Sequence, residues 1–453
     1  MEASGWASQA LKGAKPAIFW SDRPDAPTAA PALSGPATAD LTVVGGGFTG
    51  LWAAIQALEE QPELNVVVLE AERCGFGASS RNGGFCDSSL THGLENGLSH
   101  WPDDLKTLVR MGRENLDGID VAIDRYGIVA DYHRAAEIDV ATEPWHLESL
   151  RESLATHAQY GFDVELLDGD AMRSRVHSPT YLGGLLRRSD MALVDPARLC
   201  WELRRTAESL GAAIFEHSPA VDISPEGSGM EVATPNGAVR SGRVLMATNA
   251  YPGPVRRPRR YVIPVYDHVL MTEPLSSEQI SSIGWKERDG IGDASNQFHY
   301  YRLTEDDRIL WGGWDATYHF NNGLDPRHDQ QESTHGVLAE HFFETFPQLE
   351  GLRFSHRWGG PIATTTQFTA TWGTTHEGRI TWVAGYTGLG VAASRFGARV
   401  GLDLVFGTTT ERTELEMVRK KPFPFPPEPL RWAGVQITRR AIQTSDSREG
   451  KRG

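Results

Sequence analysis

Residues 41–84 read LTVVGGGFTGLWAAIQALEEQPELNVVVLEAERCGFGASSRNGG, and this stretch decides the fold of the chain. An apolar run leads into a glycine turn, a helical pattern, a second apolar run that ends in Glu70, and a loop of small residues. This order is typical of a strand–turn–helix–strand unit that holds the phosphates of a dinucleotide. The N-terminus of such a helix offers unpaired N–H groups and a partial positive charge to the phosphates.

Each glycine of the turn has a physical reason to be there. Gly45 permits a tight turn, Gly47 lets the backbone approach a pyrophosphate without a Cβ, and Gly50 lets the helix pack close to the sheet. Glu70 lies where an acid accepts hydrogen bonds from a ribose diol, and its charge disfavours a 2′-phosphate. A plain strand–helix turn without a ligand is the alternative interpretation.

Composition excludes several classes of protein. The chain has 453 residues, of which 40% are hydrophobic, enough for a sizeable core in two or three domains or in one large α/β unit with an insertion. A net charge of −15 argues against nucleic acid as a partner. The three cysteines, Cys74, Cys86 and Cys200, lack CxxC spacing, so we expect no disulfide framework and no metal site.

The chain lacks an apolar run of the ~18 residues that a membrane helix needs. Its first residues, MEASGWASQALKGAKPAIFW, do not resemble a secretory signal. We therefore expect a cytoplasmic protein without a membrane partner.

A second loop of small residues, GFGASSRNGG at 75–84, favours FAD over NAD as the dinucleotide. Small residues let the backbone run along an extended ligand, and Ser79, Arg81 and Asn82 offer donors to phosphate, ribityl or ring oxygens. A surface loop is the alternative for this segment.

The segment from Val43 to Gly84 resembles the amino-terminal signature of the D-amino acid oxidase superfamily of flavoproteins. Within that superfamily it is most similar to the glycine/sarcosine oxidase and γ-glutamylputrescine oxidase-like amine oxidases, with Ser80 in place of a glycine in GASGRNGG. Three later segments match as well: VDPARL (194–199), RVLMATNAY (243–251) and VAGYTGLGVAASRFGARV (383–400). Four ordered motifs over about 40–405 are far more specific than one glycine turn.

The resemblance implies noncovalent FAD held by these segments. The residues that it assigns to the cofactor are Gly45, Gly47, Phe48, Thr49, Gly50, Glu70, Ala71, Gly77, Ala78, Ser79, Arg81, Asn82, Gly83, Gly84, Val221, Ala247, Thr248, Gly385, Tyr386, Thr387, Gly388, Leu389 and Gly390. The helix that begins near Val391 would direct its positive end at the flavin N1–C2=O region.

The fold implied is α/β, with a Rossmann-like FAD-binding domain built from discontinuous segments and an α+β substrate domain with a mainly antiparallel sheet. The FAD-binding segments are expected at 39–95, 191–255 and 351–412, and the substrate segments at 96–190 and 256–350. Residues 1–38 are expected to form an extended lead-in, and 413–453 a Pro-rich segment and a basic C-terminal tail.

The chemistry implied is oxidation of a C–N bond by hydride transfer from a small amine to flavin N5. The imine then hydrolyses, and dioxygen or another acceptor takes the electrons, with hydrogen peroxide as the product of dioxygen. We expect Tyr301 and Trp314 as walls of the substrate pocket and His268 as a further candidate. Each of these residues has a core role as its alternative.

Departures from the family pattern narrow the substrate. The segment RWGGPIATTT (357–366) has no cysteine for covalent flavin. After Trp358–Gly360 it continues with Pro361–Thr364, where amino-acid-oxidising relatives often place an arginine that grips the substrate carboxylate, and this favours an amine or polyamine derivative. No lysine lies at 308–315 to assist oxygen, so a dehydrogenase or a natural-product tailoring enzyme with another acceptor stays open. A non-catalytic flavin-binding protein and an NAD-dependent dehydrogenase are the remaining alternatives.

Overall fold

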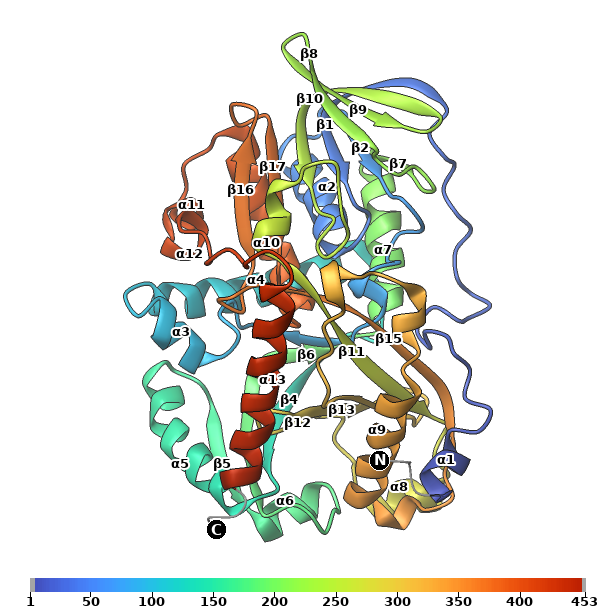
Figure 1. Cartoon of the computed structure of the whole chain (residues 1–453), viewed down its shortest axis with the longest axis vertical. Coiled ribbons are helices and arrows are strands. Elements are labelled where there is room, and N and C mark those ends of the chain that lie inside the picture. Colours follow the sequence, from blue (N-terminus) through green and yellow to red (C-terminus); the bar gives the residue numbers. More distant parts are fainter. Residues whose placement is uncertain (1–4, 450–453) are drawn as a thin grey trace.

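A computed structural model describes residues 5–449, which form two large sheets, one above the other in Figure 1. The upper, eight-stranded sheet has the order β16-β17-β10-β1-β2-β7, and the hairpin of β8 and β9 extends it at β10. All pairs among β17, β10, β1, β2 and β7 are parallel. The strands are β1 (Gly35–Val44), β2 (Val66–Leu69), β7 (Ala213–Phe215), β8 (Asp222–Glu226), β9 (Gly229–Thr234), β10 (Gly237–Met246), β16 (Thr371–Thr375) and β17 (Ile380–Ala384).

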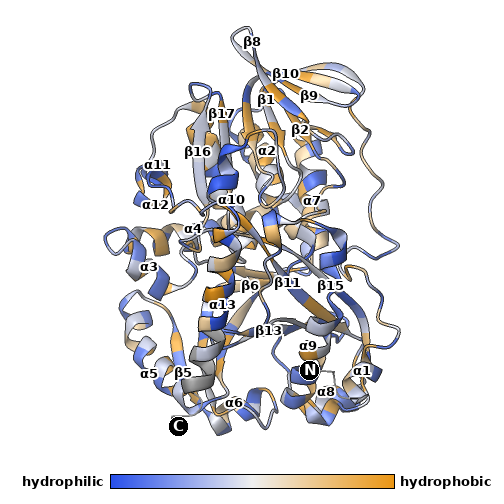
Figure 2. Cartoon of the chain, viewed as in Figure 1, coloured by the Kyte–Doolittle hydropathy of each residue, from blue (hydrophilic) through white to orange (hydrophobic). Residues whose placement is uncertain are grey.

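Helices α2 (Phe48–Glu60), α7 (Pro196–Ser209), α10 (Gly390–Phe406) and α4 (Leu105–Tyr126) pack together beside this sheet. Every residue of α2 from Phe48 to Leu58 is buried, because α7 and α10 both contact it. Its hydrophobic colour in Figure 2 agrees with a helix that is covered on all sides. The parallel strands and α2 thus hold the glycine turn in a rigid setting.

The lower sheet has nine strands in the order β15-β11-β14-β13-β12-β4-β6-β3, with β5 paired to β6. Its pairs are antiparallel, apart from the parallel pair of β12 and β4. The strands are β3 (Phe85–Asp87), β4 (His133–Ala141), β5 (Val164–Asp168), β6 (Gly183–Leu193), β11 (Ile263–Thr272), β12 (Gly290–Asp293), β13 (His299–Leu303), β14 (Ile309–Gly313) and β15 (Phe354–Thr364).

One face of the lower sheet is covered by a core that includes residues of α1 (Gly5–Ala10), α6 (Gly169–Arg175), α8 (Ser277–Ile283) and α9 (Glu332–Thr345). The remaining helices are α3 (Leu94–His100), α5 (Pro144–Gln159), α11 (Glu411–Glu414), α12 (Glu416–Arg419) and α13 (Leu430–Glu449). Short 3-10 turns are η1 (Ala78–Ser80), η2 (Arg257–Arg260), η3 (Phe320–Asn322), η4 (Pro326–Asp329) and η5 (Pro347–Leu349). In the described part of the chain, no helix is long and apolar enough to cross a membrane.

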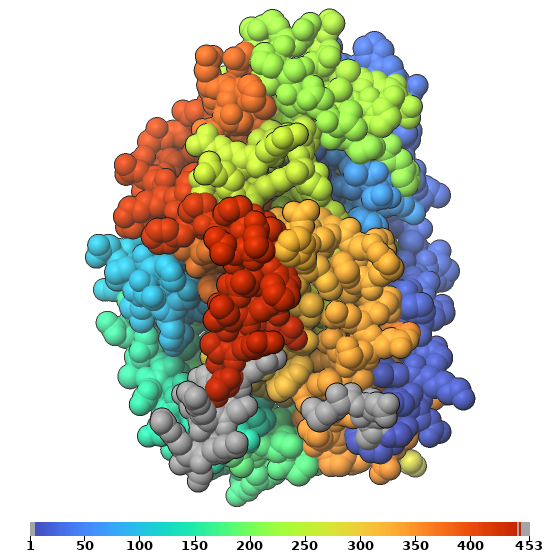
Figure 3. All heavy atoms as spheres, in the orientation of Figure 1, coloured from blue at the N-terminus to red at the C-terminus, as the bar shows by residue number. Residues whose placement is uncertain are grey.

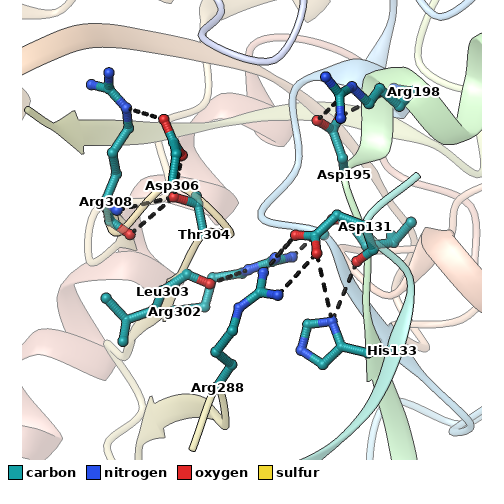
Figure 4. A network of polar contacts seen from close by, with 12 residues as sticks. Asp131, His133, Asp195, Arg198, Arg288, Arg302, Leu303, Thr304, Asp306 and Arg308 are labelled. Atoms are coloured by element: carbon teal, nitrogen blue, oxygen red, sulfur yellow. Dashed lines mark hydrogen bonds and ion pairs between the residues drawn. The ribbon is translucent and has the colours of Figure 1, made fainter. Parts of the chain in front are cut away.

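A buried arginine of the lower sheet links it to the segment that leads into α7. Arg302 of β13 donates from Nη1 to the carbonyl oxygen of Val194 at 2.8 Å. Its Nη2 lies 3.4 Å from a carboxylate oxygen of Asp131, which also accepts two hydrogen bonds from Arg288 (Figure 4). Burial lowers the pKa of Arg302 to about 10.

The α/β architecture with two sheets confirms the predicted fold class. The elements divide differently from the predicted segments at several places. Strands β3 and β15 belong to the lower sheet, although they fall inside 39–95 and 351–412; β15 is held there by antiparallel pairing with β11 from Ile263↔Thr364 onward. The expected lead-in, 1–38, contains α1, which packs on α9, and the start of β1.

Candidate active site

Three motifs that are far apart in the sequence meet at the carboxyl ends of the parallel strands. A Cβ on Gly45, whose φ is +113°, would lie 2.6 Å from the carbonyl oxygen of Ala247. The hydroxyls of Thr49 and Tyr386 lie 2.9 Å apart. The side-chain oxygen of Asn249 accepts a hydrogen bond from the N–H of Gly385 at 3.0 Å. The glycine turn, the end of β10 and the loop after β17 therefore form one site.

The side chains of Glu70 and Ser79 hold the glycine turn in place by accepting hydrogen bonds from its backbone N–H groups. One carboxylate oxygen of Glu70 accepts a hydrogen bond from the N–H of Gly46 at 2.6 Å, and the other accepts one from Glu72 at 2.9 Å. Burial raises the pKa of Glu70. The hydroxyl of Ser79 accepts a hydrogen bond from the N–H of Phe48 at 2.9 Å. Glu70 thus fixes the turn, and carboxylate lone pairs remain for a ribose.

The small-residue loop is organised by its own polar side chains. Asn82 donates to the carbonyl oxygens of Ala78 and Ser79, both at 3.0 Å, and accepts from the N–H of Gly84 at 2.8 Å. Arg81 pairs with Asp329 at 2.5 Å and donates to the carbonyl oxygen of residue 359 at 3.0 Å. Both side chains are therefore engaged with the protein, and they hold the loop in shape where it lines the cavity.

A cavity of about 1860 Å³ runs along these segments. This volume exceeds the ~300–1,000 Å³ of typical small-molecule pockets and leaves room for a dinucleotide and a substrate together. The residues assigned to the cofactor that line it are Gly45, Gly47, Phe48, Thr49, Glu70, Ala71, Gly77, Ala78, Ser79, Arg81, Asn82, Gly83, Ala247, Thr248, Tyr386, Thr387, Gly388, Leu389 and Gly390.

Four residues assigned to the cofactor lie outside this lining. Gly50, Gly84 and Gly385 are packing positions, where a Cβ would meet Gly45 oxygen at 1.8 Å, Val194 oxygen at 2.1 Å and a Thr365 methyl at 2.4 Å. Val221 is 59% exposed, and its N–H pairs with the β9 carbonyl oxygen of residue 233. The two residues before it, Pro219 and Ala220, line the cavity instead.

The geometry fits FAD. Helices α2 and α10 both begin at the cavity, and their N-cap residues, Gly47 and Leu389, make no side-chain capping bond. Two helix N-termini with their positive dipole ends suit the pyrophosphate and an electron-rich ring oxygen. Gly388 has a φ of +92°, and no atom lies within 4 Å of the position that its Cβ would take.

Comparison with known proteins agrees with this geometry. A family model described as "DAO: FAD dependent oxidoreductase" matches residues 40–404. The chain belongs to this family. FAD is therefore its cofactor, and it is an oxidoreductase.

Similar proteins cover most of the chain. It is 32% identical over 391 residues to "Gamma-glutamylputrescine oxidoreductase" of Escherichia coli (strain K12), covering 85% of this chain and 88% of that protein. It is 30% identical over 382 residues to "Probable oxidoreductase OrdL" of Haemophilus influenzae, covering 82% of this chain and 83% of that protein. The crystal structure of glycine oxidase from Geobacillus kaustophilus matches with a TM-score of 0.70 at 20% identity, over 85% of this chain and 99% of that one, and supports the fold.

Beyond the FAD-binding segments, the cavity continues over the face of the lower sheet that α9 does not cover. Successive side chains of a strand point to opposite faces of the sheet. Val265, Asp267 and Val269 of β11 line the cavity, as does Tyr300 of β13. The Tyr300 hydroxyl donates to Asp267 at 2.6 Å, and burial raises the pKa of both groups.

Two of the predicted pocket residues lie on the other face of this sheet. Tyr301 is fully buried in the core, its hydroxyl 2.8 Å from that of Tyr181. The buried ring of His268 contacts the edge of His335, and its Nε2 lies 2.9 Å from the carbonyl oxygen of His328. Neither lines the cavity, and each is one residue away from a side chain that does.

Trp314, the third predicted pocket residue, does line the cavity. It follows β14 with a φ of +69°, which is rare for a bulky side chain and signals local strain held by its surroundings. Its ring stacks on His299 with centroids 5.4 Å apart, and its backbone N–H donates to the carbonyl oxygen of Phe298 at 2.9 Å.

Sequence reasoning missed a group of carboxylates in the lining: Asp87, Glu137, Asp139 and Asp293. Arg187 pairs with Asp87 at 3.0 Å and also with Glu137. The carboxylate of Asp139 has no hydrogen bond or ion pair within residues 5–449, and burial raises its pKa. The available signal was the alternation of acidic and apolar residues in HRAAEIDVA of β4. No cluster suited to a metal ion occurs among the described residues.

Proposed function

We propose that the protein oxidises a C–N bond of an amine or polyamine derivative, with dioxygen as the electron acceptor. For a primary amine, the balance is that amine, dioxygen and water give an aldehyde, ammonia and hydrogen peroxide. The observation that carries this proposal is the continuity of one cavity from the FAD-binding loops to a carboxylate-rich sheet face.

FAD supplies the redox chemistry by accepting a hydride from the carbon beside the amine nitrogen. The residues of the chain bind and orient the substrate. Asp139 and Asp293 favour a cationic group in the part of the cavity that lies over the lower sheet, which we call the substrate chamber. Trp314 and Tyr300 offer aromatic surface to the alkyl chain and to an ammonium group of the substrate. The open sheet face admits the water that hydrolyses the imine.

The arginines of the lining support an amine over a simple α-amino acid. Arg81 pairs with Asp329, Arg187 with Asp87 and Arg439 with Asp315. Arg431 donates to the side chain of Asn322 and to the carbonyl oxygen of residue 426. In the described part of the chain, each arginine of the lining therefore already has an acceptor, which disfavours a bidentate grip on a substrate carboxylate.

Two further points belong to the proposal. None of the three cysteines lines the cavity, which supports noncovalent FAD. The similarity to a protein named for γ-glutamylputrescine supports an amine with an extended substituent. No lysine lies on β14, so an acceptor other than dioxygen is the second candidate. The cytoplasmic setting stays a prediction.

The test is an anaerobic screen of the purified holoprotein against amines, polyamines and N-methyl amino acids. We expect bleaching of the flavin absorbance by an amine with an extended substituent, and stoichiometric peroxide when air returns. Bleaching without peroxide would favour a dehydrogenase. A flavin that no amine reduces, or one that only α-amino acids reduce, would overturn the proposal. Release of flavin on denaturation tests noncovalent attachment.

A further inference from the structure

The C-terminal helix α13 forms one side of the cavity, although it lies beyond the segment 40–404 that the family model matches. Its residues Arg431, Gly434, Val435, Thr438 and Arg439 line the cavity. In Figure 1 the helix crosses in front of the lower sheet, and in Figure 3 it fills the surface between the parts drawn in teal and in orange. The substrate half of the site is therefore partly built by a segment outside the family core.

The lining residues form a single stripe of the helix. Positions 431, 434, 435, 438 and 439 are separated by the three- and four-residue steps that place side chains on one helical face. Ile437, between them in sequence, is 69% exposed and absent from the lining. The orientation of α13 is thus fixed, with one face toward the cavity and another toward solvent.

Polar contacts attach this face to one rim of the cavity. Arg439 pairs with both carboxylate oxygens of Asp315, at 2.5 and 2.6 Å, in a partly buried setting. Arg431 donates to the Asn322 side chain at 2.9 Å. Just before the helix, Glu428 accepts a hydrogen bond from the Tyr318 hydroxyl at 2.5 Å. The helix is held near its start and again at Arg439.

The attachment at Arg439 is next to a residue of the proposed pocket. Asp315 directly follows Trp314, whose strained backbone lets its ring line the cavity. In the short turn after β14, Trp314 therefore lines the cavity, and the next residue, Asp315, binds Arg439 of α13. A shift of α13 would be transmitted to the tryptophan.

We propose that α13 is a specificity-determining wall of the substrate chamber, which limits the length and bulk of the amine that can bind. The Arg439–Asp315 pair holds this wall in place. The inference rests on the proposed function, because it assigns the selectivity of that same site.

The first experiment narrows the chamber from this wall. Gly434→Leu adds a side chain at a position where a Cβ meets no atom within 4 Å, so the substitution costs no packing and favours the helix. We expect kcat/KM to fall at least tenfold for the longest amines that the wild type oxidises, with less than a twofold change for the shortest. Ile437→Leu is the matched control on the outward face. An equal change for long and short amines would overturn the inference.

The second experiment releases the wall and does not depend on turnover. In Arg439→Ala holoenzyme we expect backbone hydrogen exchange in 430–441 to accelerate at least tenfold and KM for long amines to change more than kcat. The reversed pair, Arg439→Asp with Asp315→Arg, should restore slow exchange. Arg440→Ala, an exposed neighbour outside the lining, is the control.

The two proposals fail in different ways. A wild-type protein whose flavin no amine reduces refutes the proposed function, and the exchange measurement then decides whether α13 is held as a wall by Arg439. Exchange that is unchanged in Arg439→Ala overturns the inference even if amine oxidation is established.

Discussion

At the scale of single residues, the site depends on glycines that have different jobs. Gly45 combines a φ of +113° with backbone contact, since its Cβ would meet the Ala247 oxygen at 2.6 Å. Gly407 has a φ of +72° but no atom within 4 Å of that position. Comparing Gly45 with Gly407 therefore separates two effects of adding a Cβ: the strain of a left-handed backbone, which both positions share, and the steric clash, which occurs only at Gly45.

Gly45→Ala is expected to lower the free energy of unfolding and to abolish FAD retention, because the glycine turn must move away from the end of β10. Gly407→Ala is expected to cost only about 1 kcal/mol and to retain full flavin. Urea unfolding and the flavin-to-protein absorbance ratio measure both effects. Equal behaviour of the two variants would contradict this account of Gly45.

Glu70 has two tasks in one carboxylate, to brace the turn through the N–H of Gly46 and to offer lone pairs to a ribose. Glu70→Ala removes both, so we expect the Kd of FAD to rise at least tenfold, while the chain stays folded. Glu63→Ala, on an exposed residue before β2, is the control. Titration of the apoprotein with FAD measures the effect, and an unchanged Kd would reduce Glu70 to a strand-end residue.

At the scale of elements, the alternation along strands decides which aromatic residues meet the substrate. Tyr300 lies at the junction of the two halves of the site: a Cβ on Gly83 or on Gly312 would collide with its ring at 2.8 or 2.5 Å. The small-residue loop (75–84) and β14 thus leave space for this one side chain. Its neighbour Tyr301 packs into the core instead.

Matched substitutions in β13 separate the two faces. We expect Tyr300→Phe to change kcat/KM at least fivefold and to alter the dependence of kcat/KM on pH. The reason is that Asp267 loses the hydrogen bond from the Tyr300 hydroxyl beside the cavity. Tyr301→Phe should leave the kinetics within twofold and lower the free energy of unfolding by about 1 kcal/mol. Steady-state kinetics across pH and urea unfolding test both variants. A kinetic effect of Tyr301→Phe that exceeds that of Tyr300→Phe would reverse the assignment.

The sequence predicted the elements whose signals are local. The glycine turn, the acid at the end of β2 and the second glycine signature each need a residue type that few positions tolerate, so the FAD-binding half could be anticipated. HYYRL offers no such signal, because two adjacent tyrosines give no polar–apolar alternation to tell the faces apart. The position of α13 depends on a pair between Arg439 and Asp315, residues 124 positions apart, and no local pattern encodes it.

At the scale of the whole molecule, buried histidines make stability depend on pH. His335 on α9 lies in the core behind β11, and burial, followed by the nearby His268, lowers its pKa to about 3. The folded state thus keeps it neutral, while the unfolded state binds a proton near pH 6.5. This contribution to stability is complete above pH 6.5 and is lost as the pH falls from there toward 3.

A single such group changes the free energy of unfolding by about 1.4 kcal/mol per pH unit below 6.5. Between pH 7 and pH 5 we therefore expect the wild type to lose about 2 kcal/mol more than His335→Gln, which cannot titrate. Urea unfolding at the two values measures the difference, with exposed His376→Gln as the control. Parallel pH profiles for the wild type and His335→Gln would show that this histidine is protonated equally in both states.

The lower sheet is linked to the segment before α7 through Arg302, which is fully buried and bonded to the Val194 oxygen and to Asp131. In Arg302→Met the side-chain volume is largely kept, but the Val194 oxygen loses a buried donor; Asp131 keeps its two bonds from Arg288. We expect a loss of about 2–4 kcal/mol in the free energy of unfolding, near the lower end of the cost of breaking a buried pair.

The same substitution should also weaken FAD binding. A Cβ on Gly84 would lie 2.7 Å from Arg302 Nη1, so the small-residue loop packs directly on this guanidinium. Arg240→Met, on an exposed and loosely paired arginine, should change neither quantity. If Arg302→Met unfolds at the wild-type urea concentration and keeps its flavin, the arginine is not what joins these parts of the molecule.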